Sequence, residues 1–304
     1  MSRSYRYVHY DVFTDHLFGG NQLAVFLDGR GLSSETMQVI AKEMNFSETT
    51  FVLPAERADT DLRVRIFTPA AELPMAGHPT IGSTFALARA GVIGPDRDQI
   101  VLGLGIGPTP VSLTWKGPEL SFAWMTQAPA TFGNPIADPA GAASILGLPE
   151  VAVAGTGLPV QVVSSGVPYL LVPLTSRAAV DHAYLRPDRY EMFKESARVA
   201  ATGVFVFSSQ PGSDKATVYS RMFALDFGIP EDPATGSMGG PLGCYMVRHK
   251  VVTPQKAGSI LSLQGVKMGR PSSIHISIGM DKDEITSVRV GGEAVLAGEG
   301  TLYV

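Results

Sequence analysis

A short motif decides the fold of this chain, because it occurs twice. Residues 78–83 are His-Pro-Thr-Ile-Gly-Ser, and residues 232–237 are Asp-Pro-Ala-Thr-Gly-Ser. A polar residue followed by proline and small residues is typical of a helix start, with the polar side chain at the N-cap and proline at the first helical position. The repeat therefore predicts two helices, capped by His78 and Asp232, in two similar halves of the chain.

Each motif is also preceded by a matching segment, Arg65-Ile66-Phe67 in the first half and Arg221-Met222-Phe223 in the second. Helix N-termini present unpaired N–H groups and a partial positive charge. Two such helix starts facing one another would form a cradle for an anionic ligand, which is the first indication of function.

Composition narrows the class of protein. The 304 residues, 45% of them hydrophobic and 17% charged, are typical of a soluble globular protein with two domains. A net charge of -4 without any Lys/Arg run argues against a nucleic-acid partner. No signal-like apolar segment opens the chain, and no apolar run approaches the roughly 20 residues of a membrane span. We therefore expect no membrane partner and a cytoplasmic protein.

The residues give no support for a metal or an organic cofactor. The six histidines do not have the spacing of metal ligands: His9, His16, His78, His182, His249 and His275. A single cysteine, Cys244, excludes an intramolecular disulfide and a cysteine-rich metal site. The glycine-rich run at 103–107 lacks the next glycine of a dinucleotide fingerprint, because Pro108 stands there.

Periodicity predicts the elements of the first half. Ser33 or Ser34 caps a helix that runs to about Met44, with apolar residues at helical spacing. Residues 62–68 alternate as a strand does, and residues 49–53 form a strand-prone run. The helix that begins at His78 is expected to end at Ala90, with Gly91 as its C′ residue.

The second half repeats this organisation after a Pro/Ala/Gly-rich linker at 128–140. The expected elements are helices near 140–147 and 187–197, with strands at 159–173, 202–208 and 217–223. Small residues dominate 80–90 and 234–244, where a surface helix would lose about 1 kcal/mol for each glycine. Each half is thus predicted to be α+β, with strands around one central small-residue helix; the alternative is a pair of glycine-rich loops. Residues 1–128 with 291–304 would form one half and 129–290 the other.

Several segments together resemble one known family, the PhzF family, named for an isomerase of phenazine biosynthesis. They lie at 11–21, 45–49, 67–80, 228–237 and 264–272, with a weaker match at 291–300. Ala-Gly-His-Pro-Thr and Glu-Asp-Pro-Ala-Thr-Gly-Ser are the specific pair. The resemblance covers essentially the whole chain.

The resemblance implies the fold of diaminopimelate epimerase: two pseudo-symmetric halves, each a β-barrel around a central helix, with the active site in the cleft between them. It also implies no metal, no organic cofactor and a homodimer. Leu225-Asp226-Phe227 and Met238 depart from the family pattern beside that cleft. These departures put the substrate in doubt more than the class of reaction.

Glu48 is the expected proton-transfer residue. It stands between Phe46 and Phe51 at the start of the strand-prone run. A carboxyl group held partly out of water has a raised pKa, which suits it to take a proton and return it at neutral pH. The resemblance implies this role for Glu48. From the residues alone, a solvated glutamate at a strand edge is the alternative.

His78 and Asp232 occupy matching positions in the two motifs, where simple capping is the alternative role. A helix N-terminus disfavours a charged imidazole, and a neutral imidazole can both donate and accept a hydrogen bond. We therefore expect His78 and Asp232 to position the substrate and to handle protons secondarily.

The binding residues expected beside them are Gly77, Gly236, Ser237 and Asn21. The two glycines would offer backbone N–H groups and Ser237 its hydroxyl to a ligand carboxylate, although close helix packing also explains such glycines. Asn21 would face the cleft from the first turn, or would be a plain turn residue.

The cysteine content limits the mechanism. The epimerase relatives of this fold use one cysteine at each helix start, as opposing acid and base. Here the corresponding positions are Ala76-Gly77 and Thr235-Gly236, and Cys244 is expected to be a small buried residue of the second helix. Stereoinversion through two thiols is therefore excluded, whereas one carboxylate can still move a proton between two carbons.

Three functions follow from these residues. The first is a cofactor-independent isomerase in which Glu48 moves a proton within a small carboxylate-bearing substrate. The second is a metabolite-binding protein without catalysis. The third is a cysteine-free epimerase in which Asp232 or His78 acts as the base opposite Glu48.

Overall fold

The computed structural model describes residues 3–282 and 284–304, which form two compact units. Unit 1 comprises the chain up to Gln127 together with Ala234–Gly236 and Arg289–Val304, and unit 2 comprises Ala128–Pro233 and Ser237–Val288. The expected division placed 234–236 in the second half, whereas in the structure these three residues belong to unit 1.

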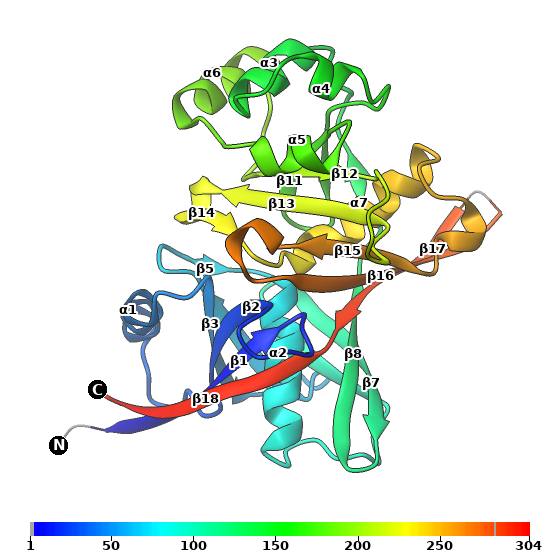
Figure 1. Cartoon of the computed structure of the whole chain (residues 1–304). Coiled ribbons are helices and arrows are strands. Elements are labelled where there is room, and N and C mark those ends of the chain that lie inside the picture. The colour runs from blue at the N-terminus through cyan, green and yellow to red at the C-terminus, as the bar shows by residue number, and fades with distance from the viewer. Residues whose placement is uncertain (1–2, 283) are drawn as a thin grey trace. The chain divides into compact units, whose positions relative to one another are not determined.

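Unit 1 surrounds one helix, α2 (Gly77–Arg89), with strands (Figure 1). The strands are β1 (Ser4–Val12), β2 (Asn21–Phe26), β3 (Glu48–Pro54), β4 (Leu62–Phe67), β5 (Glu72–Leu73), β6 (Gln99–Leu104), β7 (Gly107–Lys116), β8 (Glu119–Gln127) and β18 (Ala294–Tyr303). β1 pairs antiparallel with β18 and β2, and the order continues through β3, β4, β6, β7 and β8. The β2–β3 and β4–β6 pairs are parallel, which places the start of β3 beside β2.

The helix α2 is the core of unit 1. All residues from Gly77 to Leu87 are buried, and small residues among them let neighbouring strands approach the helix closely. A Cβ on Gly82 would lie 2.6 Å from Leu23 Cδ2 and 2.7 Å from Val12 Cγ2. The helix ends as predicted, since Ala90 is its C-cap and Gly91 follows with φ 69°. The N–H groups of Gly91 and Val92 bond back to Ala88 and Leu87, which closes a Schellman motif.

A second helix, α1 (Ser34–Met44), covers the strands from outside. Its predicted cap is confirmed, because the Ser33 side chain accepts from the backbone N–H of Thr36. Met37 and Ile40 are buried in a cluster with Phe26 and Phe51, whose rings stack at 4.9 Å. Burial of this apolar face stabilises the helix more than the intrinsic helix preference of its residues does, as is usual for short helices.

Unit 2 has the same kinds of elements with more helices. Its strands are β9 (Thr131–Phe132), β10 (Gln161–Ser164), β11 (Pro168–Pro173), β12 (Val204–Ser208), β13 (Val218–Ala224), β14 (Ile229–Asp232), β15 (Ile260–Gln264) and β16 (Ser272–Asp281), and β17 (Glu284–Gly292) continues into unit 1. Its helices are α3 (Pro139–Ile145), α4 (Val151–Ala154), α5 (Arg177–His182), α6 (Pro187–Ala197) and α7 (Gly236–Arg248), with 3-10 turns at Leu225–Phe227, Pro254–Lys256 and Val266–Met268.

The predicted helices and strands of unit 2 are present, but α4 and α5 were not predicted. Neither short helix carries a full amphipathic repeat, so that periodicity could not reveal it. The predicted linker is also more ordered than expected, because β9 lies within it and pairs with β10. The core of this unit gathers aliphatic residues from β11 and β12 around Tyr190 and Phe193 of α6.

The N-caps predicted for the two central helices, His78 and Asp232, are wrong. α2 begins at Gly77 with Ala76 as its N-cap, which makes His78 the second helical residue. α7 begins at Gly236, and Asp232 instead ends β14, where it pairs with Met222 of β13. The Asp-Pro pattern is compatible with a strand end as well as with a helix start, and strand pairing decides here.

The structure also corrects the register of the internal repeat. Gly77 and Gly236 are the first residues of the two helices, which makes Ser237 the counterpart of His78. The counterpart of Asp232 is then Leu73. His78 and Asp232 therefore do not occupy matching positions.

Among residues 3–282 and 284–304, no helix has the length and apolar character needed to cross a membrane.

The tight contact at Gly82 gives a stability prediction. Gly82→Ala gains about 1 kcal/mol of helix propensity but forces a methyl group into a packed core, which typically costs about 1–3 kcal/mol. We expect a net loss of roughly 1 kcal/mol in the free energy of unfolding, measured by urea denaturation. The matched control is Gly258→Ala, where an added Cβ meets nothing within 4 Å. Equal stabilities of the two variants would contradict tight packing around α2.

Candidate active site

Glu48 lies in the apolar setting that the sequence predicted. It is the first residue of β3, beside Leu23 of the parallel strand β2, and it is only 7% exposed. Phe51 on the same strand is fully buried. The left-handed Asn45 ends α1 just before it, so that the chain turns and brings Glu48 inward. The alternative of a solvated strand-edge glutamate is thereby excluded.

His78 is the close neighbour of Glu48. Its Nε2 lies 3.2 Å from Oε2 of Glu48, and its ring is almost completely buried. Burial lowers the pKa of His78 to about 3, against a smaller opposing contribution from a backbone hydrogen bond with Gln22. The imidazole is therefore neutral at physiological pH, as the sequence predicted.

Asn21 sets the orientation of this imidazole. Its amide nitrogen lies 3.2 Å from Nδ1 of His78 and donates to the carbonyl of Ala234 at 3.0 Å. An amide nitrogen only donates, and the Ala234 carbonyl only accepts, which together fix the amide orientation. On this basis we assign Nδ1 as the acceptor and the ring proton of His78 to Nε2, the nitrogen that faces Glu48.

The two helix-start glycines lie against one another. A Cβ on Gly236 would lie 2.9 Å from the Cα of Gly77 and 2.8 Å from the ring of Phe13. The carbonyl of Gly236 accepts from the side chain of Gln127 at 3.0 Å. Ala76 caps α2 without a side-chain hydrogen bond, so that the N-cap residue does not occupy the first-turn N–H groups of this helix.

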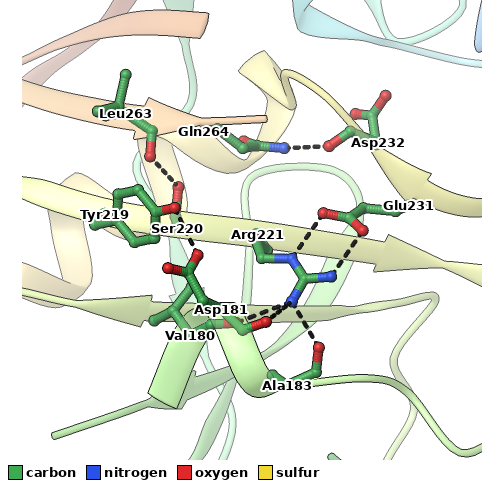
Figure 2. A network of polar contacts seen from close by, with 10 residues as sticks. All are labelled: Val180, Asp181, Ala183, Tyr219, Ser220, Arg221, Glu231, Asp232, Leu263 and Gln264. Atoms are coloured by element: carbon green, nitrogen blue, oxygen red, sulfur yellow. Dashed lines mark hydrogen bonds and ion pairs between the residues drawn. The ribbon is translucent and has the colours of Figure 1, made fainter. Parts of the chain in front are cut away.

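Asp232 belongs to unit 2 and is also buried, with 6% exposure. Its main-chain carbonyl accepts from the side chain of Gln264 at 2.7 Å, and its neighbour Glu231 forms a two-pronged ion pair with Arg221 (Figure 2). A Cβ on Gly265 would lie 2.5 Å from the carbonyl oxygen of Pro233. The backbone on both sides of Asp232 is therefore held by neighbouring elements.

Ser237 also lies in unit 2, in the first turn of α7. Its hydroxyl lies 2.9 Å from the hydroxyl of Tyr169 on β11, and both residues are buried. The sequence reasoning missed Tyr169, which no motif signalled. It also assigned no role to Gln264 or Arg221, although both stand in segments that it had singled out.

Cys244 is buried, as expected, and burial raises the pKa of its thiol. In the part of the chain that the structure describes, no group of three or more His, Cys, Asp or Glu side chains is arranged to hold a metal ion.

Residues 10–300 match the family of phenazine biosynthesis-like proteins, PhzC-PhzF. The trans-2,3-dihydro-3-hydroxyanthranilate isomerase of Pseudomonas aeruginosa is 34% identical over 99% of this chain and 100% of its own. An uncharacterized isomerase of Mesorhizobium japonicum is 34% identical over 98% of both chains. The family resemblance stated from the motifs is thus confirmed.

Solved structures agree on the fold. A PhzF-family protein of Bacillus anthracis has a TM-score of 0.85 at 25% identity, covering 99% of this chain and 100% of its own. A predicted epimerase of Pseudomonas aeruginosa has a TM-score of 0.79 at 31% identity, covering 98% and 99%. A hydroxyproline epimerase of Agrobacterium vitis, 14% identical over 99% of this chain and 93% of its own, shares the fold with a TM-score of 0.70. The predicted α+β fold class is confirmed.

The hydrogen bonds of Asn21 predict the protonation state of His78. We expect nitrogen-15 NMR to show one neutral tautomer, protonated at Nε2, between pH 5 and pH 8. Asn21→Asp should move the proton to Nδ1, because a carboxylate can accept from this nitrogen but cannot donate to it. An Nδ1 proton in the wild type would overturn the assignment.

The buried His78 also predicts a pH dependence of stability. Its pKa is near 6.5 in the unfolded chain and about 3 in the folded one, so that below pH 6.5 only the unfolded state takes up the proton. The folded state therefore has its full stability with respect to His78 above pH 6.5. This stability decreases as the pH falls toward 3, because the unfolded chain binds a proton that the folded chain does not. Between pH 7 and pH 5 the wild type should lose roughly 2 kcal/mol more than His78→Gln. The exposed His16→Gln should behave as the wild type; equal pH slopes in all three proteins would refute the prediction.

Proposed function

This chain belongs to the PhzC-PhzF family and is an isomerase, and we propose that Glu48 is the acid/base that moves its proton. The proposed substrate is a small unsaturated carboxylate, of the class named for the Pseudomonas aeruginosa relative. The observation that supports this proposal best is the buried contact of Glu48 with a neutral His78.

The proposed reaction needs no external redox partner. The Glu48 carboxylate removes a proton from an activated carbon, and the C–H electron pair shifts the neighbouring double bond. The proton, now on Glu48, returns to a second carbon of the same substrate. Atoms and electrons balance within the substrate, and one carboxylate serves first as base and then as acid.

The neutral imidazole suits this cycle. A protonated histidine would form a fixed ion pair with Glu48 and weaken it as a base. The Nε2–H of a neutral His78 can donate a hydrogen bond to Glu48 or to charge that develops on the substrate. Asn21, predicted from sequence to contact the substrate, would contribute here by holding His78.

The first turn of α2 is proposed to bind the substrate carboxylate. Backbone N–H groups at a helix start favour an anion. Gly77 and Gly236 are proposed to offer backbone N–H groups to it, and the Ser237 hydroxyl is proposed as a further donor. Asp232 is proposed to orient the substrate and to assist proton transfer.

A cysteine-free epimerase is the second candidate. Asp232 is a second buried carboxylate, and a relative 31% identical is titled a predicted epimerase. This function would require Asp232 as an opposing base and would invert a stereocentre instead of moving a double bond. The predicted homodimer and cytoplasmic location stay predictions.

The test is proton NMR in D2O with trans-2,3-dihydro-3-hydroxyanthranilate and a panel of small unsaturated and amino carboxylates. We expect wild-type protein to introduce deuterium at carbon and to shift a double bond. Glu48→Gln should lower this rate by about 10²–10⁴-fold, the usual contribution of a general acid/base, with binding retained in calorimetry.

Glu43→Gln, which removes an exposed carboxylate just upstream, is the matched control and should keep full activity. Undiminished exchange in Glu48→Gln would rule out the proposed role of Glu48. Exchange with inversion and no movement of the double bond would favour the epimerase. Binding without any exchange would indicate a non-catalytic metabolite-binding protein.

A further inference from the structure

A two-pronged arginine–glutamate pair occurs at the same place in both halves of the repeat. Arg65 donates through Nε and Nη2 to Glu72 at 2.8 and 2.6 Å, and Arg221 donates through the same nitrogens to Glu231 at 2.8 Å each. Each guanidinium also lies over the phenylalanine two residues further along its strand, at 5.0 and 4.9 Å. Each glutamate stands five residues before the first glycine of a central helix. We call the second pair the Arg221–Glu231 clamp.

The clamp is more strongly fixed than its counterpart. The side chain of Arg221 is 8% exposed and that of Glu231 is 18% exposed, against 17% and 38% in the first pair. Nη1 of Arg221 also donates to the carbonyls of Val180, Asp181 and Ala183 at 2.9, 3.2 and 2.6 Å. These are carbonyls at the C-terminal end of α5, where a cation is favoured.

The two copies differ in the residue that follows the glutamate. In unit 1 this residue is Leu73, and in unit 2 it is Asp232. Successive side chains of a strand point to opposite faces, so that holding Glu231 toward Arg221 directs Asp232 away from it. Figure 2 shows the two carboxylates of β14 directed in these different ways. The Gln264 bond to the Asp232 carbonyl holds the same residue from the other side.

The N–H donors of the Arg221 guanidinium are engaged by groups other than the Asp232 carboxylate. Glu231 takes the Nε/Nη2 fork, and the α5 carbonyls take Nη1. Arg221 precedes Met222, the residue of β13 that pairs with Asp232, so that without Glu231 its fork could turn to Asp232. Such a pairing would neutralise Asp232 and draw it from its position.

We propose that the Arg221–Glu231 clamp is a positioning device for Asp232. Glu231 occupies the guanidinium and fixes β14, which leaves the Asp232 carboxylate directed to the other face for the reaction. The inference rests on the proposed role of Asp232. In this proposal the clamp residues act through Asp232 and not by contact with the substrate.

The test compares Glu231→Gln and Arg221→Lys with Asp214→Asn. Asp214 pairs with Arg177 in the same unit through two N–H groups and is therefore a matched ion pair away from β14. Glu231→Gln keeps the shape of the side chain, and Arg221→Lys keeps the charge but loses the fork. We expect both to lower kcat by about 10- to 100-fold, as misplaced catalytic groups do, with KM changed less than threefold. Asp214→Asn should retain wild-type kinetics.

A double-mutant cycle separates positioning from general destabilisation. If the clamp acts through Asp232, Glu231→Gln should have no further effect on kcat in an Asp232→Ala background. If the effects of Glu231→Gln and Asp232→Ala on kcat multiply in the double variant, the proposal is overturned. Full activity of Asp232→Ala beside an inactive Glu48→Gln would overturn it as well, while the proposed role of Glu48 would stand.

A measurement without substrate covers the case in which the wild type turns over none of the panel compounds. Carbon-13 NMR of the side-chain carboxyls identifies the Asp232 signal by its loss in Asp232→Asn. We expect this signal to shift in Glu231→Gln and in Arg221→Lys but not in Asp214→Asn. An Asp232 signal unmoved in both clamp variants would overturn the proposal, whatever the outcome for the proposed function.

Discussion

The amide of Asn21 is the contact on which the arrangement in unit 1 depends. One nitrogen reaches Nδ1 of His78 on α2 and the carbonyl of Ala234, a residue more than 200 positions along the chain. It joins the start of β2, the start of α2 and the segment Ala234–Gly236 at one buried point. Because buried polar groups need partners, this contact fixes the ring orientation and brings Gly236 against Gly77.

The two copies of the repeat share several structural residues but differ at the positions proposed to be functional. Both copies have the arginine two residues before the phenylalanine and the glutamate five residues before the helix-start glycine, while the segment between phenylalanine and glutamate is three residues longer in the second copy. His78 in one copy corresponds to Ser237 in the other, and Leu73 corresponds to Asp232. The repeat is thus symmetric at these shared residues and asymmetric at the residues that we propose to handle protons. Such asymmetry suits one-carboxylate chemistry better than a pair of equivalent bases.

Sequence patterns predicted the structural features that depend on interactions between residues close together in the chain. Ser33, the apolar face of α1 and Gly91 were predicted because caps and periodicity act over a few residues. The helix starts were mistaken because Asp232-Pro233 satisfies both a cap and a strand end, and the choice depends on pairing with Met222. The partners Tyr169–Ser237 and Asn21–Ala234 lie far apart in sequence. No spacing rule connects them, and only the fold does.

The two units treat a buried carboxylate in a similar way. A permanent cation beside a carboxylate weakens it as a base. The partner of Glu48 on α2 is an imidazole that burial keeps neutral, and the arginine nearest Asp232 in the chain is engaged by Glu231 and by α5. In each unit the fold thus buries a carboxylate that we propose to be functional, while His78 stays neutral and Arg221 is paired with Glu231. A stronger ion pair at either position would stabilise the carboxylate and remove its capacity to exchange a proton.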